Sequence, residues 1–207
     1  MKDRLGVKAA ATREKILDTA ETAVLQKSFG SVGINEFLKS ASVPKGSFYH
    51  YFDSKESFGV ELIRYAASRY AENLDQLLLS QADTAREDLL RFIKFHISYY
   101  EKNNFQITCL VSKIASEAST ISEEMRLSLN EIFQDWTEKF SNLVRRGHGD
   151  GSIPLNLGAE EMGQLLFSTW LGANTQVATL QSAAPFHSWL VTTQALLNDP
   201  PSLPELN

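Results

Sequence analysis

Cysteine is almost absent from this sequence, since Cys109 is the only one among 207 residues. A single cysteine excludes an internal disulfide framework and any cysteine-rich zinc site. The histidines are also few and lack the short spacing of metal ligands; they are His50, His96, His148 and His187. We therefore expect neither a structural metal nor a cofactor.

Long apolar runs are missing as well. No stretch approaches the roughly 20 apolar residues that a membrane-crossing helix needs. The first residues are polar and charged, without the apolar core of a secretory signal. With 43% hydrophobic and 22% charged residues, the composition is typical of a globular protein. These features predict a cytoplasmic location.

Patterns that would indicate an enzyme are not found either. No glycine-rich loop follows a predicted strand, and no paired carboxylates or Ser/His/Asp order suggests a catalytic cleft. The glycines at 147–151 follow a predicted helix and precede Pro154, which indicates a connector. The sequence therefore does not predict catalysis.

The net charge of −5 hides an uneven distribution. Residues 1–55 contain nine Lys/Arg against six Asp/Glu, and the remainder contains eleven against nineteen. A basic end on an acidic body fits a DNA-facing domain joined to a domain with another task. We divide the chain into a DNA-binding domain at 1–55, a sensing and dimerisation domain at 56–200, and a loose tail at 201–207.

Helical periodicity dominates, and no segment shows the sustained alternation of a strand. Thr12 suits the N-cap of the first helix, and Asp53 with Glu56 suits a capping box at the start of the fourth. Arg146 and Gly147 suit the last turn and C-cap of the seventh. The predicted helices cover approximately residues 12–28, 34–40, 44–52, 53–79, 84–102, 106–118, 121–146, 158–181 and 185–198. We therefore predict an all-α fold.

Residues 33–52 have the layout of a helix-turn-helix, in which the second helix enters the DNA major groove. Pro44 suits the first turn of that second helix, where its missing N–H costs nothing. Lys45, Gly46 and Ser47 follow at the helix N-terminus, where free N–H groups and the helix dipole attract phosphate.

Two aromatic side chains, Tyr49 and His50, continue this helix and can reach phosphate oxygens and thymine methyls. Lys55, at the start of the next helix, is placed to neutralise a phosphate. From the residues alone, two functions remain open. One is DNA binding, and the other is a helical protein-interaction adaptor without DNA binding.

The run Val43-Pro-Lys-Gly-Ser-Phe-Tyr-His-Tyr-Phe52, followed by Ser54-Lys-Glu56, closely resembles the signature of TetR-family transcription regulators. Residues 29–36 are similar to the approach to the second helix in that family. The resemblance covers about residues 12–60, and it favours DNA binding over the adaptor.

The resemblance implies a TetR-like fold of about nine helices and a homodimer that binds a palindromic operator. It also implies a repressor that a small molecule releases. Its DNA contacts would come from Thr12, Gly33, Pro44, Lys45, Gly46, Ser47, Tyr49, His50 and Lys55. Two residues depart from the family pattern. Ser42 replaces the usual turn glycine, and Gly33 replaces a Ser or Thr that caps the second helix.

The last two predicted helices, at 158–181 and 185–198, are the candidate dimer interface. The first is apolar or small over an unusually wide arc, which is typical of a helix buried on two sides. By the resemblance, these helices form a four-helix bundle with a second subunit. Packing within one subunit is the alternative.

The candidate effector residues are aromatic side chains that could line an apolar pocket: Phe92, Phe95, Tyr99, Trp136 and Trp170. Aromatic residues at helical spacing also form ordinary cores, so both interpretations stay open.

Cys109 is the candidate sensor thiol. Residues 108–117, 121–126 and 170–174 resemble the NemR-like subgroup of the family, typified by the N-ethylmaleimide-responsive repressor. Some members of this subgroup have a corresponding cysteine that responds to electrophiles or oxidants. Cys109 lies near a predicted helix N-terminus, where the dipole lowers a thiol pKa, and Lys113 follows one turn on. The alternative is an inert, buried cysteine.

Overall fold

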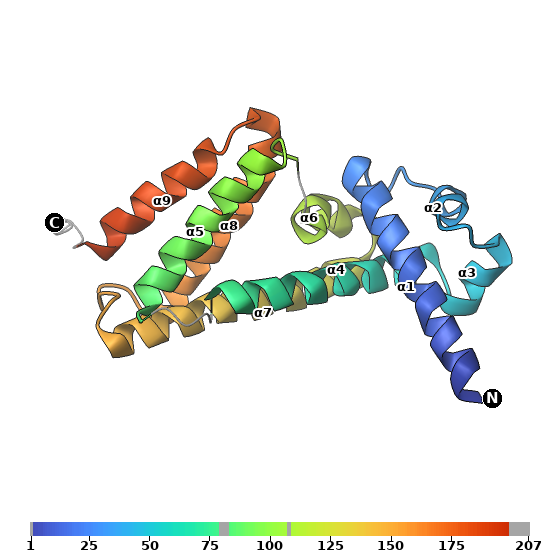
Figure 1. Cartoon of the computed structure of the whole chain (residues 1–207), viewed down its shortest axis with the longest axis horizontal. Coiled ribbons are helices and arrows are strands. Elements are labelled where there is room, and N and C mark those ends of the chain that lie inside the picture. Colours follow the sequence, from blue (N-terminus) through green and yellow to red (C-terminus); the bar gives the residue numbers. More distant parts are fainter. Residues whose placement is uncertain (1, 79–82, 107–108, 199–207) are drawn as a thin grey trace. The chain divides into compact units, whose positions relative to one another are not determined.

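A computed structural model describes residues 2–78, 83–106 and 109–198, and these residues form helices and connecting turns without any strand (Figure 1). The all-α prediction is confirmed. The helices are α1 (Lys2–Gln26), α2 (Ile34–Ala41), α3 (Lys45–Tyr51), α4 (Lys55–Leu78), α5 (Ala85–Lys102), α6 (Leu110–Ile121), α7 (Glu123–Asp150), α8 (Ala159–Leu180) and α9 (Ala184–Leu197). The predicted loose tail at 201–207 lies outside the described residues.

The chain divides into two compact units. Unit 1 comprises residues 1–70 and 108–132, so α6 and the start of α7 join the first three helices and the front of α4. Unit 2 comprises residues 71–107 and 133–207 and contains α5, α8 and α9 with the remainders of α4 and α7.

The core of unit 1 begins with the apolar stripe of α1, where Ile16, Leu17 and Ala20 are at most 1% exposed. The stripe packs on α2 and α6. A second part of this core is a cluster of phenylalanine rings from α2, α3, the α3 C-cap and α4, with centroids 4.8–6.0 Å apart: Phe37, Phe48, Phe52 and Phe58. The burial of these large rings stabilises the packing of the short helices α2 and α3.

The core of unit 2 is richer in tryptophan. The rings of Trp136 and Trp170 meet edge-on at 5.5 Å, and Phe92 contacts Phe140 and Trp189 in the same way. Where α7 and α8 cross, Gly163 permits a close approach, because a Cβ there would lie 2.7 Å from the backbone nitrogen of Ser141.

The predicted starts of α1 and α4 are wrong. Helix α1 begins at Lys2, so Thr12 is an interior residue and not an N-cap. The alanine-rich segment before Thr12 favours helix and carries no proline to stop it. Helix α4 begins at Lys55, and its cap pairs Ser54 with Ser57: each backbone N–H donates to the other hydroxyl at 3.0 Å. Asp53 and Glu56 do not form the predicted box, because the helix starts one residue later than expected.

Two further boundaries differ from the prediction. Helix α6 begins at Leu110, with Cys109 as its N-cap residue, and not near 106. Helix α7 runs through Gly147 to Asp150, and Gly151 is the glycine with a positive φ, +74°. A Cβ on Gly147 would lie 2.5 Å from the side chain of Ile153, so this glycine serves close packing.

The described residues lack membrane-spanning helices and clusters of metal-ligating side chains. No helix there is long and apolar enough to cross a membrane. No group of three or more His, Cys, Asp or Glu in that part of the chain could hold a metal ion.

Candidate nucleic-acid interface

Helix α3 is anchored by one side chain and exposes the opposite face. Phe48 is fully buried, and its ring lies 5.3 Å from Phe58 and 6.0 Å from Phe37. Tyr49, the next residue, is 56% exposed. The other predicted DNA-contact residues on or beside α3 are exposed, except for Ser47, which is half-buried: Pro44, Lys45, Gly46 and His50. The structure therefore brings six of the nine predicted residues together on one short segment.

The start of α3 has the geometry that proline favours. Pro44 is the N-cap residue, with φ −61° and ψ 143°, and the helix begins one residue after it. Its backbone carbonyl accepts from the N–H of Ser47 at 2.9 Å. The N–H groups that come before Ser47 in the helix belong to the exposed residues Lys45 and Gly46.

The turn between α2 and α3 contains Ser42, which was predicted to occupy the position of a turn glycine. Ser42 is left-handed, with φ 55° and ψ 42°, so the expectation that this serine stands in a glycine position is confirmed. Its N–H donates to the carbonyl of Lys39 at 3.1 Å, and Val43 donates to Leu38 at 2.9 Å. These bonds close α2 and set the direction in which α3 begins.

Gly33 is the N-cap of α2 and offers no side-chain cap. Beside it, Lys27, one residue past α1, donates to the carboxylate of Glu36 in the first turn of α2. A carboxylate in that turn is favourable for the helix dipole. The sequence alone did not predict this ion pair.

Lys55 is held at the start of α4 by two contacts. Its Nζ donates to the carbonyl oxygen of Gly30 at 3.3 Å and lies 5.2 Å from the centroid of the Phe29 ring. These contacts fix the amine beside the helix-turn-helix, which suits the predicted phosphate contact. Thr12 is half-buried on α1, and its predicted contact stays a prediction.

Arg13 was not among the site residues that the sequence predicted. Its guanidinium pairs with Glu61 of α4 and lies 5.6 Å from the ring centroid of Phe52, the C-cap residue of α3. Arg13 thus links α1 to α4 and to the C-terminal end of α3. A basic residue next to Thr12 was visible in the sequence, but its partners are 39 and 48 positions away.

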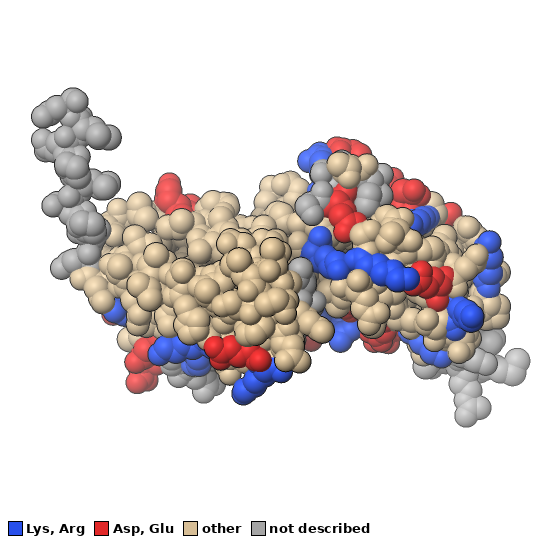
Figure 2. All heavy atoms as spheres, turned by 90° about the horizontal axis from the view of Figure 1, so that it is seen from above, with Lys and Arg blue, Asp and Glu red and all other residues tan. Residues whose placement is uncertain are grey.

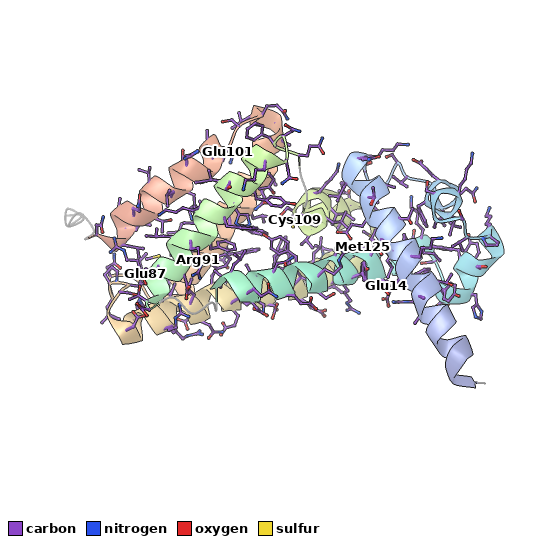
Figure 3. The ribbon with its side chains drawn as sticks, in the orientation of Figure 1. Glu14, Glu87, Arg91, Glu101, Cys109 and Met125 are labelled. Atoms are coloured by element: carbon purple, nitrogen blue, oxygen red, sulfur yellow. The ribbon has the colours of Figure 1, made fainter. Side chains whose placement is uncertain are left out.

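Cys109 is the N-cap residue of α6, so its predicted place at a helix N-terminus is confirmed (Figure 3). The side chain is 3% exposed. Burial raises the pKa of the thiol, opposed by the hydroxyl of Ser112 and by backbone hydrogen bonds from Ser112 and Val111. The expectation of a lowered thiol pKa is wrong, because the cost of desolvating a thiolate exceeds the effect of the helix end.

The five predicted effector aromatics lie in unit 2, and they fall into two groups. Phe92, Trp136 and Trp170 are at most 1% exposed and form the ring core. Phe95 is 44% exposed and stacks on the half-buried Tyr99 with centroids 5.7 Å apart. Cys109 belongs to unit 1, so the sequence grouped side chains that the structure assigns to different units.

A short helix with an exposed basic and aromatic face, set on a second helix through a left-handed turn, defines a helix-turn-helix DNA-binding protein. Two family models match the chain. Residues 16–62 match "Bacterial regulatory proteins, tetR family", and residues 85–192 match "Tetracyclin repressor-like, C-terminal domain". The chain belongs to the TetR family, and it is a DNA-binding transcriptional regulator.

Among its relatives is the HTH-type transcriptional repressor NemR of Escherichia coli strain K12, which is 31% identical over 91% of this chain and 95% of its own length. The crystal structure of the reduced form of E. coli NemR has a TM-score of 0.82, with 32% identity, and covers 93% of this chain and 100% of that one. The transcriptional regulator AcuR of Cereibacter sphaeroides is 27% identical over 89% of this chain and 84% of its own length. The recognition of a NemR-like TetR regulator from sequence is confirmed.

Proposed function

We propose that this chain is a repressor that binds a palindromic operator as a homodimer through α3, and that a small-molecule or electrophilic signal releases it. The observation that carries the DNA-binding part is the contrast within α3. Phe48 is fully buried, whereas Tyr49 is 56% exposed and Lys45 and His50 are exposed beside it. Because the ring core holds the helix backbone, the exposed face is preorganised for the major groove.

The test is a fluorescence anisotropy titration with a duplex that covers the region upstream of the chain's own gene. We expect the affinity to fall steeply with salt, because phosphate contacts release counterions. Lys55→Ala should weaken specific and random DNA alike, whereas Ser47→Ala and His50→Ala should change the preference between sequences. Lys94→Ala, an exposed lysine of α5, is the matched control for loss of one charge.

A protein-interaction adaptor is the competing function. It would leave the duplex unbound at every salt concentration while the chain stayed folded and helical.

The three variants test a separate point. Equal losses of affinity for specific and random DNA in Lys55→Ala, Ser47→Ala and His50→Ala would contradict the division between base readout and phosphate contact.

The proposed dimer interface uses α8 and α9. Residues 162–198 contain no Lys, Arg, Asp or Glu, and Figure 2 shows a broad face of unit 2 with few charged side chains. Three apolar side chains on these helices are unusually exposed for a single chain: Leu165 at 42%, Leu180 at 54% and Val191 at 64%. A second copy of the chain would bury these side chains. The dimer would then carry two helix-turn-helix motifs, which together supply the sequence specificity that one short helix lacks.

Sedimentation velocity tests the dimer. We expect the wild type to sediment as a dimer and Val191→Glu as a monomer, because a carboxylate would have to be buried without a partner. Leu155→Glu is the control, since Leu155 is 78% exposed in the α7–α8 connection. A dimer that persists in Val191→Glu contradicts an interface through this part of α9.

The effector part of the proposal rests on the stacked pair on α5. Phe95 and Tyr99 can meet a ligand without unpacking the core, unlike the three buried aromatics of the predicted set. A ligand must favour the conformation that does not bind DNA if it is to release the operator. A thermal-shift screen with small carbonyl compounds and aromatic acids, repeated on Phe95→Ala, tests this assignment.

Cys109 is the proposed site for an electrophile. The thiol would give up its proton to water, the thiolate formed would add to the C=C bond of a maleimide, and the resulting carbanion would take up a proton. Because the thiol is 3% exposed, the adduct has no room without movement of α6. We expect N-ethylmaleimide to abolish operator binding by the wild type and to leave Cys109→Ser unaffected. Modified wild-type protein that binds normally would exclude the thiol as a sensor.

Operator binding also implies where the protein works. Because the bacterial chromosome lies in the cytoplasm, we propose that location for the chain.

A further inference from the structure

The end of α1 is capped by a side chain from α6. Lys113, one turn into α6, donates its Nζ hydrogen bond to the carbonyl oxygen of Leu25 in unit 1. Leu25 is the last residue but one of α1, and the last four carbonyls of a helix have no donor within it. The last turn of α1 has no basic residue of its own. Lys113 therefore supplies both the missing donor and a positive charge at the negative end of the helix dipole.

The first turn of α6 faces the last two turns of α1. Cys109 and Lys113 are four residues apart, as are Glu21 and Leu25, so each pair lies on one side of its helix. Lys113 contacts Leu25, and the carboxylate of Glu21 acts electrostatically on the thiol of Cys109. A hydrogen bond and a through-space electrostatic interaction thus join the same stretches of α1 and α6.

The chain leaves α1 directly into the segment that supports the helix-turn-helix. Lys27 pairs with Glu36 in the first turn of α2, and the Phe29 ring and the Gly30 carbonyl hold Lys55. Three lysines therefore interact at residues 25–30. Lys113 of α6 donates to Leu25, Lys27 pairs with Glu36 of α2, and Lys55 of α4 contacts Phe29 and Gly30. A shift at Leu25 would move this whole set.

We propose that Lys113 is a positioning residue for DNA binding: by capping α1 it fixes the segment at 25–30 and, through it, the placement of α2 and α3. Lys113 acts through α1 and not through a contact with DNA. The proposal rests on operator binding by α3. It predicts that an interaction inside unit 1, at a residue outside the predicted DNA-contact set, controls operator affinity.

The experiment compares operator binding by Lys113→Met and Lys113→Arg with the wild type. Lys113→Met keeps the length of the side chain and removes the charge and the donor. We expect its affinity to fall about tenfold, the loss expected for one hydrogen bond to a charged group. Lys113→Arg keeps both and should stay within about threefold of the wild type. Lys94→Met, on the exposed face of α5, controls for the change in net charge and should bind normally.

Two further readouts separate positioning from a phosphate contact and from loss of folding. The slope of log affinity against log salt should be unchanged in Lys113→Met, because no counterion-releasing contact is lost. Amide hydrogen exchange at residues 27–33 should become faster, while that of α9 stays as in the wild type. If Lys113→Met does not fold, Lys113→Gln, which keeps an N–H donor but not the charge, takes its place.

Wild-type affinity in Lys113→Met would overturn the proposal. So would a salt slope that falls by about one, which would make Lys113 itself a phosphate contact. A wild-type chain that fails to bind any operator would refute the proposed function instead, so the two failures are distinguishable.

Discussion

Trp170 donates its indole N–H to Nε2 of His96 at 3.2 Å, and this bond decides the protonation state of the histidine. Since Nε2 accepts, Nδ1 carries the proton and donates it to the carbonyl of Phe92 at 2.9 Å. Burial lowers the pKa of His96 from 6.5 to about 4, although the bond to Phe92 opposes the shift. The ring is therefore a neutral link between α5 and α8 in a single tautomer.

The neutral histidine predicts a pH dependence of stability. The unfolded chain binds a proton at His96 near pH 6.5, whereas the folded chain does so only near pH 4. The stabilisation is present in full above pH 6.5 and is lost as the pH falls towards 4, with a loss of about 2 kcal/mol at pH 5. Urea unfolding at pH 7.5 and pH 5 measures it. His96→Gln should lack this part of the pH dependence, and an unchanged difference between the two pH values would contradict it.

Ser42→Gly should stabilise the chain. The left-handed backbone of Ser42, at φ 55°, is strained for a side chain but not for glycine. We expect a gain of up to about 1 kcal/mol in the free energy of unfolding. Ser40→Gly, in the last turn of α2, is the matched control and should lose about 0.5 kcal/mol. A loss of stability in both variants would show that the turn does not store strain.

Gly59→Ala should destabilise unit 1. A Cβ on Gly59 of α4 would lie 2.7 Å from both the Sδ of Met125 and a ring carbon of Phe29. Overpacking of this kind costs about 1–3 kcal/mol. Because the Phe29 ring also holds Lys55, the affinity for DNA should fall with it. Met125 lies at the start of α7 (Figure 3).

The partner substitution checks the cause. Met125→Ala removes a buried side chain and destabilises the chain by itself. Combined with Gly59→Ala it should cost less than the sum of the two single changes, which would show as a favourable coupling energy in a double-mutant cycle. Gly149→Ala is the control, because nothing lies within 4 Å of a Cβ there. Additive effects at 59 and 125 would mean that the two sites do not collide.

Asp88→Ala should unfold unit 2 at lower denaturant concentration. The carboxylate is fully buried in α5 and pairs with Arg91 of the same helix and Arg146 of α7. Both arginines are more than a third exposed, so we expect a loss of about 2–3 kcal/mol and not the full cost of breaking a buried pair. Glu123→Ala, which breaks an exposed pair with Arg126 in the first turn of α7, is the control and should cost no more than about 1 kcal/mol.

Much of the fold could be predicted because the signals are local. The 3.6-residue periodicity located every helix, and Ser42 was identified as a serine in a glycine position. Helix starts were less predictable, since Ser54 and Ser57, and not Asp53 and Glu56, cap α4. Several hydroxyls and carboxylates near one boundary can each form a cap, and the packing of the helix selects among them.

The candidate site divides in the same way. The exposed face of α3 follows from the identity of its residues, because Phe48 in a short helix has to be buried and its neighbours then face outward. The contacts of Arg13 with Glu61 and Phe52 could not be predicted, since they join residues 39 or more positions apart.

The sequence by itself determined that the fold is all-helical and that the recognition helix lies at residues 44–52, because periodicity and short motifs are properties of neighbouring residues. Only the tertiary structure decided the state of Cys109, whose pKa rises with burial that no local pattern encodes. It also decided that Lys113 caps α1, across 88 positions of sequence. Desolvation and long-range hydrogen bonds depend on which distant segments meet, and folding alone brings those segments together.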